Sequence, residues 1–319
     1  TFEAMPVQEE GRLKPMQTVA RYKLMRINNS KRLRFEVSGE KFKVSATEWL
    51  MDCLFRPEVA KKMPIFKVNN PAVIEAIGVT PHNSPRERYS YEEISSVPDA
   101  MKLLSERTGE LGKIMEDSDK EEEGKEARRD PVNAGLLSLK SAVNEFEWSV
   151  NAFNFARDGI AVDLGEASED FKKAEGGRSR VSYFLSEFDK IIEIARKPDG
   201  QEFVAKISAA FNVLERDVAT AGVKDRVSMI SLAMFPPISD DDEEWIKPGY
   251  LIEQLSFRKN ELSTEEQKTF AQWALPKIKA LEGLTRNVGS PSFGVDLKAL
   301  SDGIVKKAKE RGEYKNIEL

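Results

Sequence analysis

The sequence predicts a mainly α protein, a helical bundle with a small α+β lobe at its amino-terminal end. Residues 45–48 and 90–93 both read Ser-x-x-Glu, the spacing at which a serine and a glutamate cap the free N–H groups of a helix start. Between residues 136 and 153, apolar side chains recur at steps of three and four, the spacing of one buried helix face. The segments 33–37 and 41–44 alternate apolar and polar residues around a Ser-Gly-Glu turn, which predicts a β-hairpin.

The first elements follow from residues 6–22, PVQEEGRLKPMQTVARY. Pro6 begins a short extended segment. The backbone N–H of the first residue of a helix has no partner within the helix, so proline, which lacks this N–H, is favoured there. We therefore expect a helix from Pro15 onward. Arg12 and Lys14 then lie just ahead of a helix N-terminus, where cations and free N–H groups together suit an anionic group. They are the candidate anion-facing or partner-facing residues. The alternative is a solvated basic turn with no ligand.

Four parts are expected along the chain. Residues 1–115 form the basic α+β lobe, and residues 116–130, which are rich in acidic side chains, form a solvated, flexible linker. Residues 131–225 form a helical bundle. Residues 226–319 supply a strand that returns to the first lobe and the carboxy-terminal helices.

Several elements of the last two parts have their own patterns. Helices are expected at 181–196 and 202–220, and a buried strand at 227–235. Pro276 is expected to kink or restart a helix that follows a third Ser-x-x-Glu box. A final amphipathic helix is expected at 295–311.

The composition excludes several kinds of site. One cysteine and one histidine are too few for internal disulfides, cysteine-rich clusters or paired-histidine metal sites, and they speak against a serine triad. We expect Cys53 to be a small buried hydrophobe and His82 to lie in a solvated loop. There is no metal motif, no phosphate-binding glycine loop and no Cys-x-x-Cys-His haem attachment site.

Charge is unevenly distributed. From Arg12 to Lys67 there are 14 basic and 5 acidic residues, a local charge of +9 in a chain whose net charge is −5. Such a lobe suits phospholipid headgroups, haem propionates or an acidic partner. Nucleic-acid motifs are absent, so no nucleic acid is expected among the partners.

Membrane segments are not expected within the chain. No apolar run approaches the roughly 18 to 20 residues of a membrane helix, which predicts a soluble chain. The chain begins at Thr1 without an initiator methionine or a signal peptide, so we expect a piece of a longer protein.

Several blocks of the sequence resemble one family when they are taken in order. These are VQEEGRLKPMQTVAR, a Trp-bearing helix that ends in Pro-Glu, PIFKV, RYSYEEI, and an apolar strand that ends in Phe-Pro-Pro before an acidic run and Trp. Together they resemble the extracytoplasmic region of System II (CcsA/ResB-type) cytochrome c biogenesis proteins. The residues that carry the resemblance are Gly11, Pro15, Trp49, Tyr91, Phe235, Pro236 and Trp245.

The resemblance implies an extracytoplasmic region of a membrane protein for cytochrome c maturation, at the periplasmic face of a bacterial inner membrane. It implies a role in positioning or partner binding, with apocytochrome c, other biogenesis subunits or the membrane parts of the same protein as partners. Catalytic residues and cofactors are expected to be absent from this chain, whereas the full-length parent is expected to handle haem and to act as a haem lyase. The alternative is an α-helical protein-interaction or scaffold module without a haem role.

Overall fold

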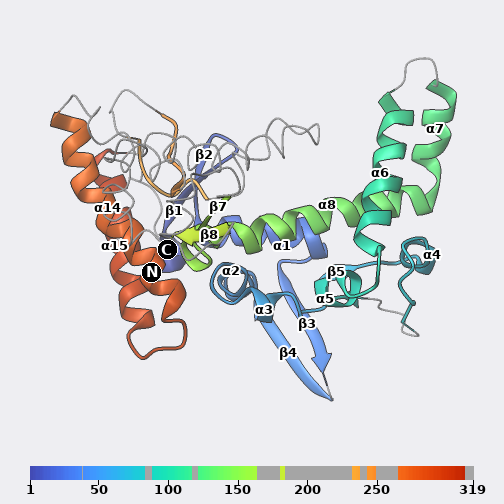
Figure 1. The fold of residues 1–319 in the computed structure, drawn as a ribbon, viewed down its shortest axis with the longest axis horizontal. Coiled ribbons are helices and arrows are strands. Elements are labelled where there is room, and N and C mark those ends of the chain that lie inside the picture. Colours follow the sequence, from blue (N-terminus) through green and yellow to red (C-terminus); the bar gives the residue numbers. More distant parts are fainter. Residues whose placement is uncertain are drawn as a thin grey trace. The chain divides into compact units, whose positions relative to one another are not determined.

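The computed structural model describes residues 1–37, 39–82, 88–116, 121–163, 180–183, 232–237, 243–248 and 265–312. Within these ranges the protein is mainly helical, and its strands form short antiparallel pairs near the amino-terminal end and once later in the chain, which confirms the predicted fold class (Figure 1). The chain divides into two compact units. Unit 1 combines residues 1–19 with 151–319, and unit 2 consists of residues 20–150. The division into four parts drawn from the sequence stays a prediction.

Unit 1 begins with a 3-10 turn at Phe2–Ala4 and a hairpin of β1 (Pro6–Glu9) and β2 (Arg12–Pro15). Its two-residue loop has positive φ at both positions, 54° at Glu10 and 71° at Gly11, the backbone of a type I′ turn. Glycine takes such a φ at no steric cost, which explains Gly11.

Helix α1 spans Met16–Asn28. The sequence predicted that the helix begins at Pro15. This is wrong, because Pro15 belongs to β2 and pairs with Pro6 at the end of the hairpin. The N–H of Met16 donates to the carbonyl of Met5 over 2.8 Å, so the strand pairing continues up to the helix start. Val19, Ala20 and Leu24, at steps of one and four residues, are fully buried and form the inward face of the helix.

Unit 2 opens with the predicted hairpin, formed by β3 (Arg32–Val37) and β4 (Glu40–Ser45). Helix α2 (Ala46–Phe55) follows with the predicted capping box at Ser45 and Glu48, and a single turn, α3 (Pro57–Ala60), comes next. Both strands of the hairpin contact α2. The second predicted box, at Ser90 and Glu93, is also present and opens α5.

The remaining elements of unit 2 surround one apolar core. They are β5 (Phe66–Lys67), α4 (Pro71–Glu75), β6 (Arg88–Tyr89), α5 (Tyr91–Ser95), α6 (Ala100–Glu116), α7 (Glu121–Arg129) and α8 (Pro131–Asn151). The core contains Trp49, Phe66 and Phe146, all fully buried, and the rings of the two phenylalanines meet edge to face at 5.7 Å. The predicted apolar stripe is confirmed on α8, where its first five members are buried, and its last member, Phe153, is buried just after the end of the helix.

Helix α7 corrects the expectation of a flexible linker at 116–130. Residues 121–129 are helical and contact α6, with which they form a helical hairpin (Figure 1). Gly124 allows this packing, because a Cβ there would lie 3.2 Å from the carbonyl oxygen of Ile114. Lys125 adds an ion pair of 3.0 Å to Glu122 within the helix.

The rest of unit 1 holds the later helices and strands. Its elements are α9 (Asn154–Arg157), β7 (Ile160–Asp163), β8 (Arg180–Tyr183), α14 (Glu265–Arg286) and α15 (Phe293–Glu310). The predicted helix at 181–196 is wrong at its start, because residues 180–183 pair with β7 as a strand. The rest of that segment and the predicted helix at 202–220 lie outside the described residues.

Helices α14 and α15 lie side by side in unit 1 (Figure 1). Helix α14 continues through Pro276 without a restart, and the predicted helix at 295–311 is confirmed by α15. Among the described residues, no helix combines the length and apolar character needed to cross a bilayer.

The expected return of a strand to the amino-terminal hairpin is seen in part. Ala233 forms an antiparallel bridge with Gln8, and Phe235 forms one with Ile246. The N–H of Gln8 donates to the carbonyl of Ala233 over 2.9 Å. These are isolated bridges, so the segment at 232–237 closes on β1 without forming a full strand there.

Candidate functional site

The two cations singled out in the sequence have different surroundings in the β1–β2 hairpin. Lys14 Nζ lies 3.3 Å from a carboxylate oxygen of Glu9 and 3.2 Å from one of Glu10, and its side chain is only 16% exposed. The turn at Glu10 and Gly11 brings these carboxylates back over β2, so the charge of Lys14 is balanced locally. Arg12 stands opposite Glu9 in the register, and its side chain is exposed. Of the two, Arg12 is therefore the one available to an anionic partner.

A larger group of cations lies on the β3–β4 hairpin, which we call the basic ribbon (residues 31–45). In an antiparallel pair, residues directly opposite each other share a face. The pairs on one face are Arg32 with Ser45, Arg34 with Lys43, and Glu36 with Lys41. All four cations of this face are exposed, as is Lys31 just before it. Within the part of the chain that the structure describes, none of these five cations has an ion-pair partner.

The basic face is electrostatically unfavourable for the hairpin itself. Arg34 and Lys43 stand directly opposite each other, and like charges in such a pair destabilise a sheet. A two-stranded hairpin is also only marginally stable by itself. The arrangement is therefore better suited to meeting negative charge than to holding the hairpin together.

The opposite face of the basic ribbon is apolar. Leu33 is fully buried, and the rings of Phe35 and Phe42 stack across the two strands with their centroids 5.4 Å apart. Phe42 remains 41% exposed. Leu33 therefore anchors the strand end near α2, while the phenylalanine pair stiffens the outer part of the ribbon on the face opposite the cations.

Three further cations of the basic segment, Lys23, Arg26 and Arg56, are paired. Lys23 Nζ lies 2.5 Å from one carboxylate oxygen of Glu145, and an Arg26 guanidinium nitrogen lies 3.4 Å from the other. Arg56 lies 2.5 Å from Asp52. The charge excess counted in the sequence thus contains cations that are paired with carboxylates and exposed cations that are not, and five of the second kind lie on or beside the basic ribbon.

The residues that carry the family resemblance are mainly structural in position. Gly11 forms the type I′ turn, Pro15 ends β2, and Trp49, Phe235 and Trp245 are buried. Pro236 follows Phe235 and is also buried. They occupy turns, strand ends and core positions of the two units, so they do not form a shared site.

Tyr91 is the exception, because it joins a polar pair. Its hydroxyl donates to a carboxylate oxygen of Glu147 over 2.8 Å, and its ring lies 5.2 Å from that of Phe146. Burial raises the pKa of Tyr91, and the adjacent charge of Glu147 raises it further. The phenol is therefore kept neutral and serves as a hydrogen-bond donor between α5 and α8.

Gln8 was missed in the sequence although it connects distant segments. Its side-chain amide nitrogen donates to the carbonyl of Glu243 over 2.9 Å, and its amide oxygen accepts from the N–H of Trp245 over 2.8 Å. No local pattern marks such a glutamine. The basic ribbon did carry a signal, the repeated cation-x-cation spacing at 32–34 and 41–43, which places each pair on one face of a strand.

The single histidine and cysteine give no reactive centre. His82 is not merely solvated, because its ring stacks on Tyr89 at 4.4 Å and its Nε2 lies 3.3 Å from Glu93. Cys53 is fully buried as predicted, and burial raises the pKa of its thiol well above the ordinary value. Among the described residues, no three histidine, cysteine, aspartate or glutamate side chains are grouped as metal ligands.

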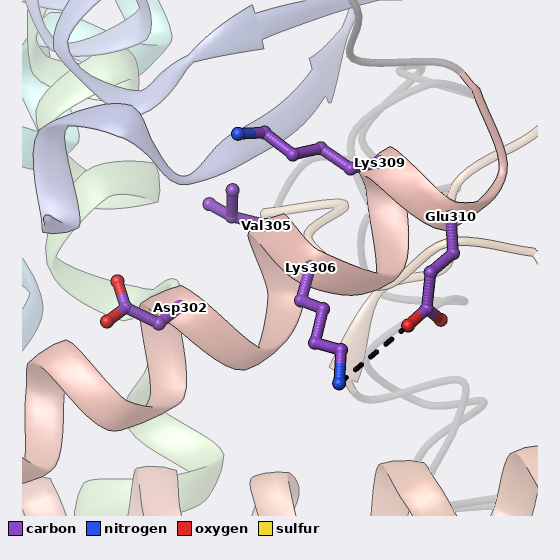
Figure 2. Close-up of a pocket in the computed structure, with 5 residues that line it drawn as sticks. All are labelled: Asp302, Val305, Lys306, Lys309 and Glu310. Carbon is purple, nitrogen blue, oxygen red and sulfur yellow. Dashed lines mark ion pairs between the residues drawn. The ribbon is translucent and has the colours of Figure 1, made fainter.

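An open hollow runs along one side of α15 and is lined by residues of that helix alone (Figure 2). Lys306 and Glu310 point toward each other at 4.0 Å, and Lys309 points away from them (Figure 2). Asp302 lies beside Lys298, which balances its charge. These charges do not converge on a common point, so this surface is not a candidate site.

A scan of protein-family models gave no match, and searches of curated proteins and of solved structures found no similar protein. The basic ribbon is therefore the candidate site on the strength of its own residues.

Proposed function

We propose that this chain is the extracytoplasmic region of a System II cytochrome c biogenesis protein, at the periplasmic face of a bacterial inner membrane. It positions a partner, and other parts of the parent carry out haem attachment. The family assignment is supported by the ordered sequence blocks that end in the Phe-Pro-Pro and Trp segment. The partner-binding role is supported by one observation, the five exposed cations of the basic ribbon that lack ion-pair partners among the described residues.

The partner that fits the basic ribbon carries an acidic surface, and apocytochrome c or another biogenesis subunit is the proposed source. Several cations of one sign on one face attract an acidic surface over about 8 Å at physiological salt and speed its encounter. Binding of this kind weakens as salt rises, because exposed charges are screened.

The test reverses the central pair of the ribbon in the full-length parent. Arg34→Glu with Lys43→Glu should lower covalent haem attachment to a reporter cytochrome about tenfold or more, because two attractive charges become repulsive. The matched control is Lys62→Glu with Arg107→Glu, which makes the same charge change at exposed positions outside the ribbon. Attachment at the wild-type level in the ribbon variant would remove the proposed role.

The family assignment has a separate test in the parent gene. Several membrane helices after Leu319, with a tryptophan-rich extracytoplasmic motif and flanking histidines, are expected if the resemblance holds. A stop codon or an unrelated domain there would overturn the family assignment and favour the scaffold alternative. The charge-reversal variant would then be tested for weaker binding to a protein partner instead of for lower haem attachment to a cytochrome.

A further inference from the structure

The basic ribbon has a free backbone edge along strand β4, in addition to its exposed cations. Its sheet contains two strands only, and among the described residues no further strand or isolated bridge lies beside β4. The hairpin projects from the helices of unit 2 (Figure 1), and Lys41, Phe42 and Lys43 are all exposed. An edge of this kind is a template for a further strand, which can come from another chain.

The register of the hairpin determines which backbone groups face this edge. Val37 pairs with Glu40 around a two-residue turn, and the two residues that flank such a turn exchange both of their hydrogen bonds. Hydrogen-bonded and non-hydrogen-bonded pairs alternate from there, which places Lys41 and Lys43 in non-hydrogen-bonded pairs. The backbone N–H and C=O groups of Lys41 and Lys43 therefore point away from β3, toward the outer edge of β4.

The outer edge of β3 is less suitable for a further strand. At its start, the Ser30 hydroxyl donates to the carbonyl of Arg32 over 2.9 Å and accepts from the N–H of the same residue over 3.4 Å. Further along, the outward-facing positions of β3 are Arg34 and Glu36, a cation and an anion. On β4 both such positions carry a lysine, so a strand that is added there meets a single sign of charge.

The two faces of the hairpin define the side chains that a third strand must carry. In an antiparallel pair, residues opposite each other share a face. Residues opposite Lys41 and Lys43 would therefore lie on the basic face, and the residue between them on the face where Phe35 and Phe42 stack. Acidic residues at alternate positions with apolar residues between them fit this edge. A second copy of β4 does not fit, because its lysines would share a face with these lysines.

We propose that the outer edge of β4 binds an extended segment of an acidic partner as a third, antiparallel strand. Hydrogen bonds to the backbone of Lys41 and Lys43 provide the pairing, and the alternation of acidic and apolar side chains selects the segment. This mode of binding rests on the proposed function, because it specifies how the acidic partner meets the basic ribbon. It requires that the partner present a strand and not only a negatively charged surface.

The test titrates the chain with the peptide acetyl-TVEVEVT-amide, whose two glutamates are separated by one valine. Saturable binding with a dissociation constant below about 1 mM is expected by NMR. The isomer acetyl-TEEVVVT-amide has the same composition and charge, but its adjacent glutamates point to opposite faces of a strand. It should bind at least about tenfold more weakly, because only one of its glutamates can face the lysines of β4.

Backbone pairing is tested by methylation of the peptide nitrogens. Methylating both glutamates removes the donors that face β4 in this register, and should weaken binding at least about tenfold. Methylating the first and last valines, whose N–H groups point away from β4, is the matched control and should leave the affinity within about threefold. In the unaltered chain, the bound peptide should slow the exchange of the Lys41 and Lys43 amide protons at least about tenfold, but not that of Arg34 and Glu36.

The outcomes separate this proposal from the proposed function. Equal affinity of all the peptides would overturn the third strand, and the proposed function would stand if Arg34→Glu with Lys43→Glu still weakened their binding. Binding that this variant leaves as unchanged as the Lys62→Glu with Arg107→Glu control would contradict the role of the ribbon itself.

Two further outcomes would also overturn the proposal. Slower exchange at Arg34 and Glu36 in place of Lys41 and Lys43 would contradict the assignment to β4. Vesicles of equal parts phosphatidylglycerol and phosphatidylcholine are titrated in parallel. Binding to the vesicles without saturable binding of any peptide would assign this edge to a lipid surface.

Discussion

Glu145 is enclosed by two cations of α1, and only 5% of it is exposed. Lys23, its closer partner, is 8% exposed. Removing one member of a buried ion pair leaves an uncompensated charge, whereas replacing both by apolar residues can be nearly neutral. Substituting either residue alone is therefore expected to destabilise the fold, even where the net contribution of the ion pair to stability is small.

We expect Glu145→Leu to lower the free energy of unfolding by about 3 to 5 kcal/mol, because Lys23 stays buried and loses the carboxylate that lies 2.5 Å from its Nζ. Urea unfolding followed by tryptophan fluorescence measures the loss. The double variant Lys23→Met with Glu145→Leu should recover most of it. A double variant as unstable as the single one would show that packing, and not the unpaired charge, accounts for the effect.

The hydroxyl of Tyr91 gives a prediction with a pH dependence. Tyr91→Phe removes its hydrogen bond to Glu147 and should lower the free energy of unfolding by about 1 to 2 kcal/mol at pH 8. The pKa of Tyr91 is raised in the folded state, so this stabilisation is fully present below the ordinary tyrosine pKa of about 10. It is lost as the pH rises above that value.

Urea unfolding at pH 8 and at about pH 10.5 tests this sign, since the difference between wild type and Tyr91→Phe should shrink at the higher pH. Tyr22→Phe on α1 is the control, because the ring of Tyr22 is 49% exposed. It should change the free energy of unfolding by less than about 0.5 kcal/mol. A difference for Tyr91→Phe that grows with pH would contradict the assignment.

At the scale of single elements, the β1–β2 hairpin and the segment at 243–248 are joined through one side chain. Gln8→Ala removes both side-chain hydrogen bonds and keeps the backbone bond to Ala233. We expect the amide proton of Trp245 to exchange with solvent at least about tenfold faster, because its acceptor is gone. Hydrogen exchange read by NMR measures this.

Gln272→Ala on α14 is the matched control, since Gln272 is exposed. It should leave the exchange of the Trp245 amide unchanged. Unchanged exchange in Gln8→Ala as well would show that the burial of Trp245, and not the bond from Gln8, protects this amide.

The elements that the sequence predicted correctly depend on local interactions. A capping box needs only a serine and a glutamate three residues apart, and both predicted boxes are present at Ser45 and Ser90. Pro15 was misassigned because its conformation depends on pairing with Pro6, nine residues earlier. The helical start predicted at residue 181 was wrong for the same reason, since β8 pairs with a strand some twenty residues before it.

The candidate site was predicted only in outline. The excess of positive charge in the amino-terminal part is a property of composition and could be counted. Which cations are exposed depends on contacts between distant residues, such as Lys23 with Glu145. The compensation of Lys14 depends on a turn that places Glu9 diagonally across the hairpin. Such contacts leave no pattern along the chain, so the sequence pointed to Arg12 and Lys14 and overlooked Arg34 and Lys43.

At the scale of the whole molecule, unit 2 is a continuous stretch of chain with its own core. We expect the fragment 16–151, which keeps α1 and α8 complete, to fold without unit 1, because Trp49, Phe66 and Phe146 are buried within residues 20–150. Urea unfolding should be a single cooperative transition, and the near-ultraviolet circular dichroism should show ordered aromatic rings. Binding of a hydrophobic dye with no cooperative transition would contradict this independence.

The bond between Gln8 and Trp245 has a consequence for the order of events during synthesis. The two residues are 237 positions apart, so the β1–β2 hairpin leaves the ribosome long before its partner exists. At elongation rates of about 5 to 20 residues per second, the interval is roughly 10 to 50 s. Unit 2 is complete well within that time, whereas the first residues of the chain wait with their apolar side chains uncovered. A chaperone that protects the β1–β2 hairpin during this interval would therefore raise the yield of unit 1 without affecting unit 2.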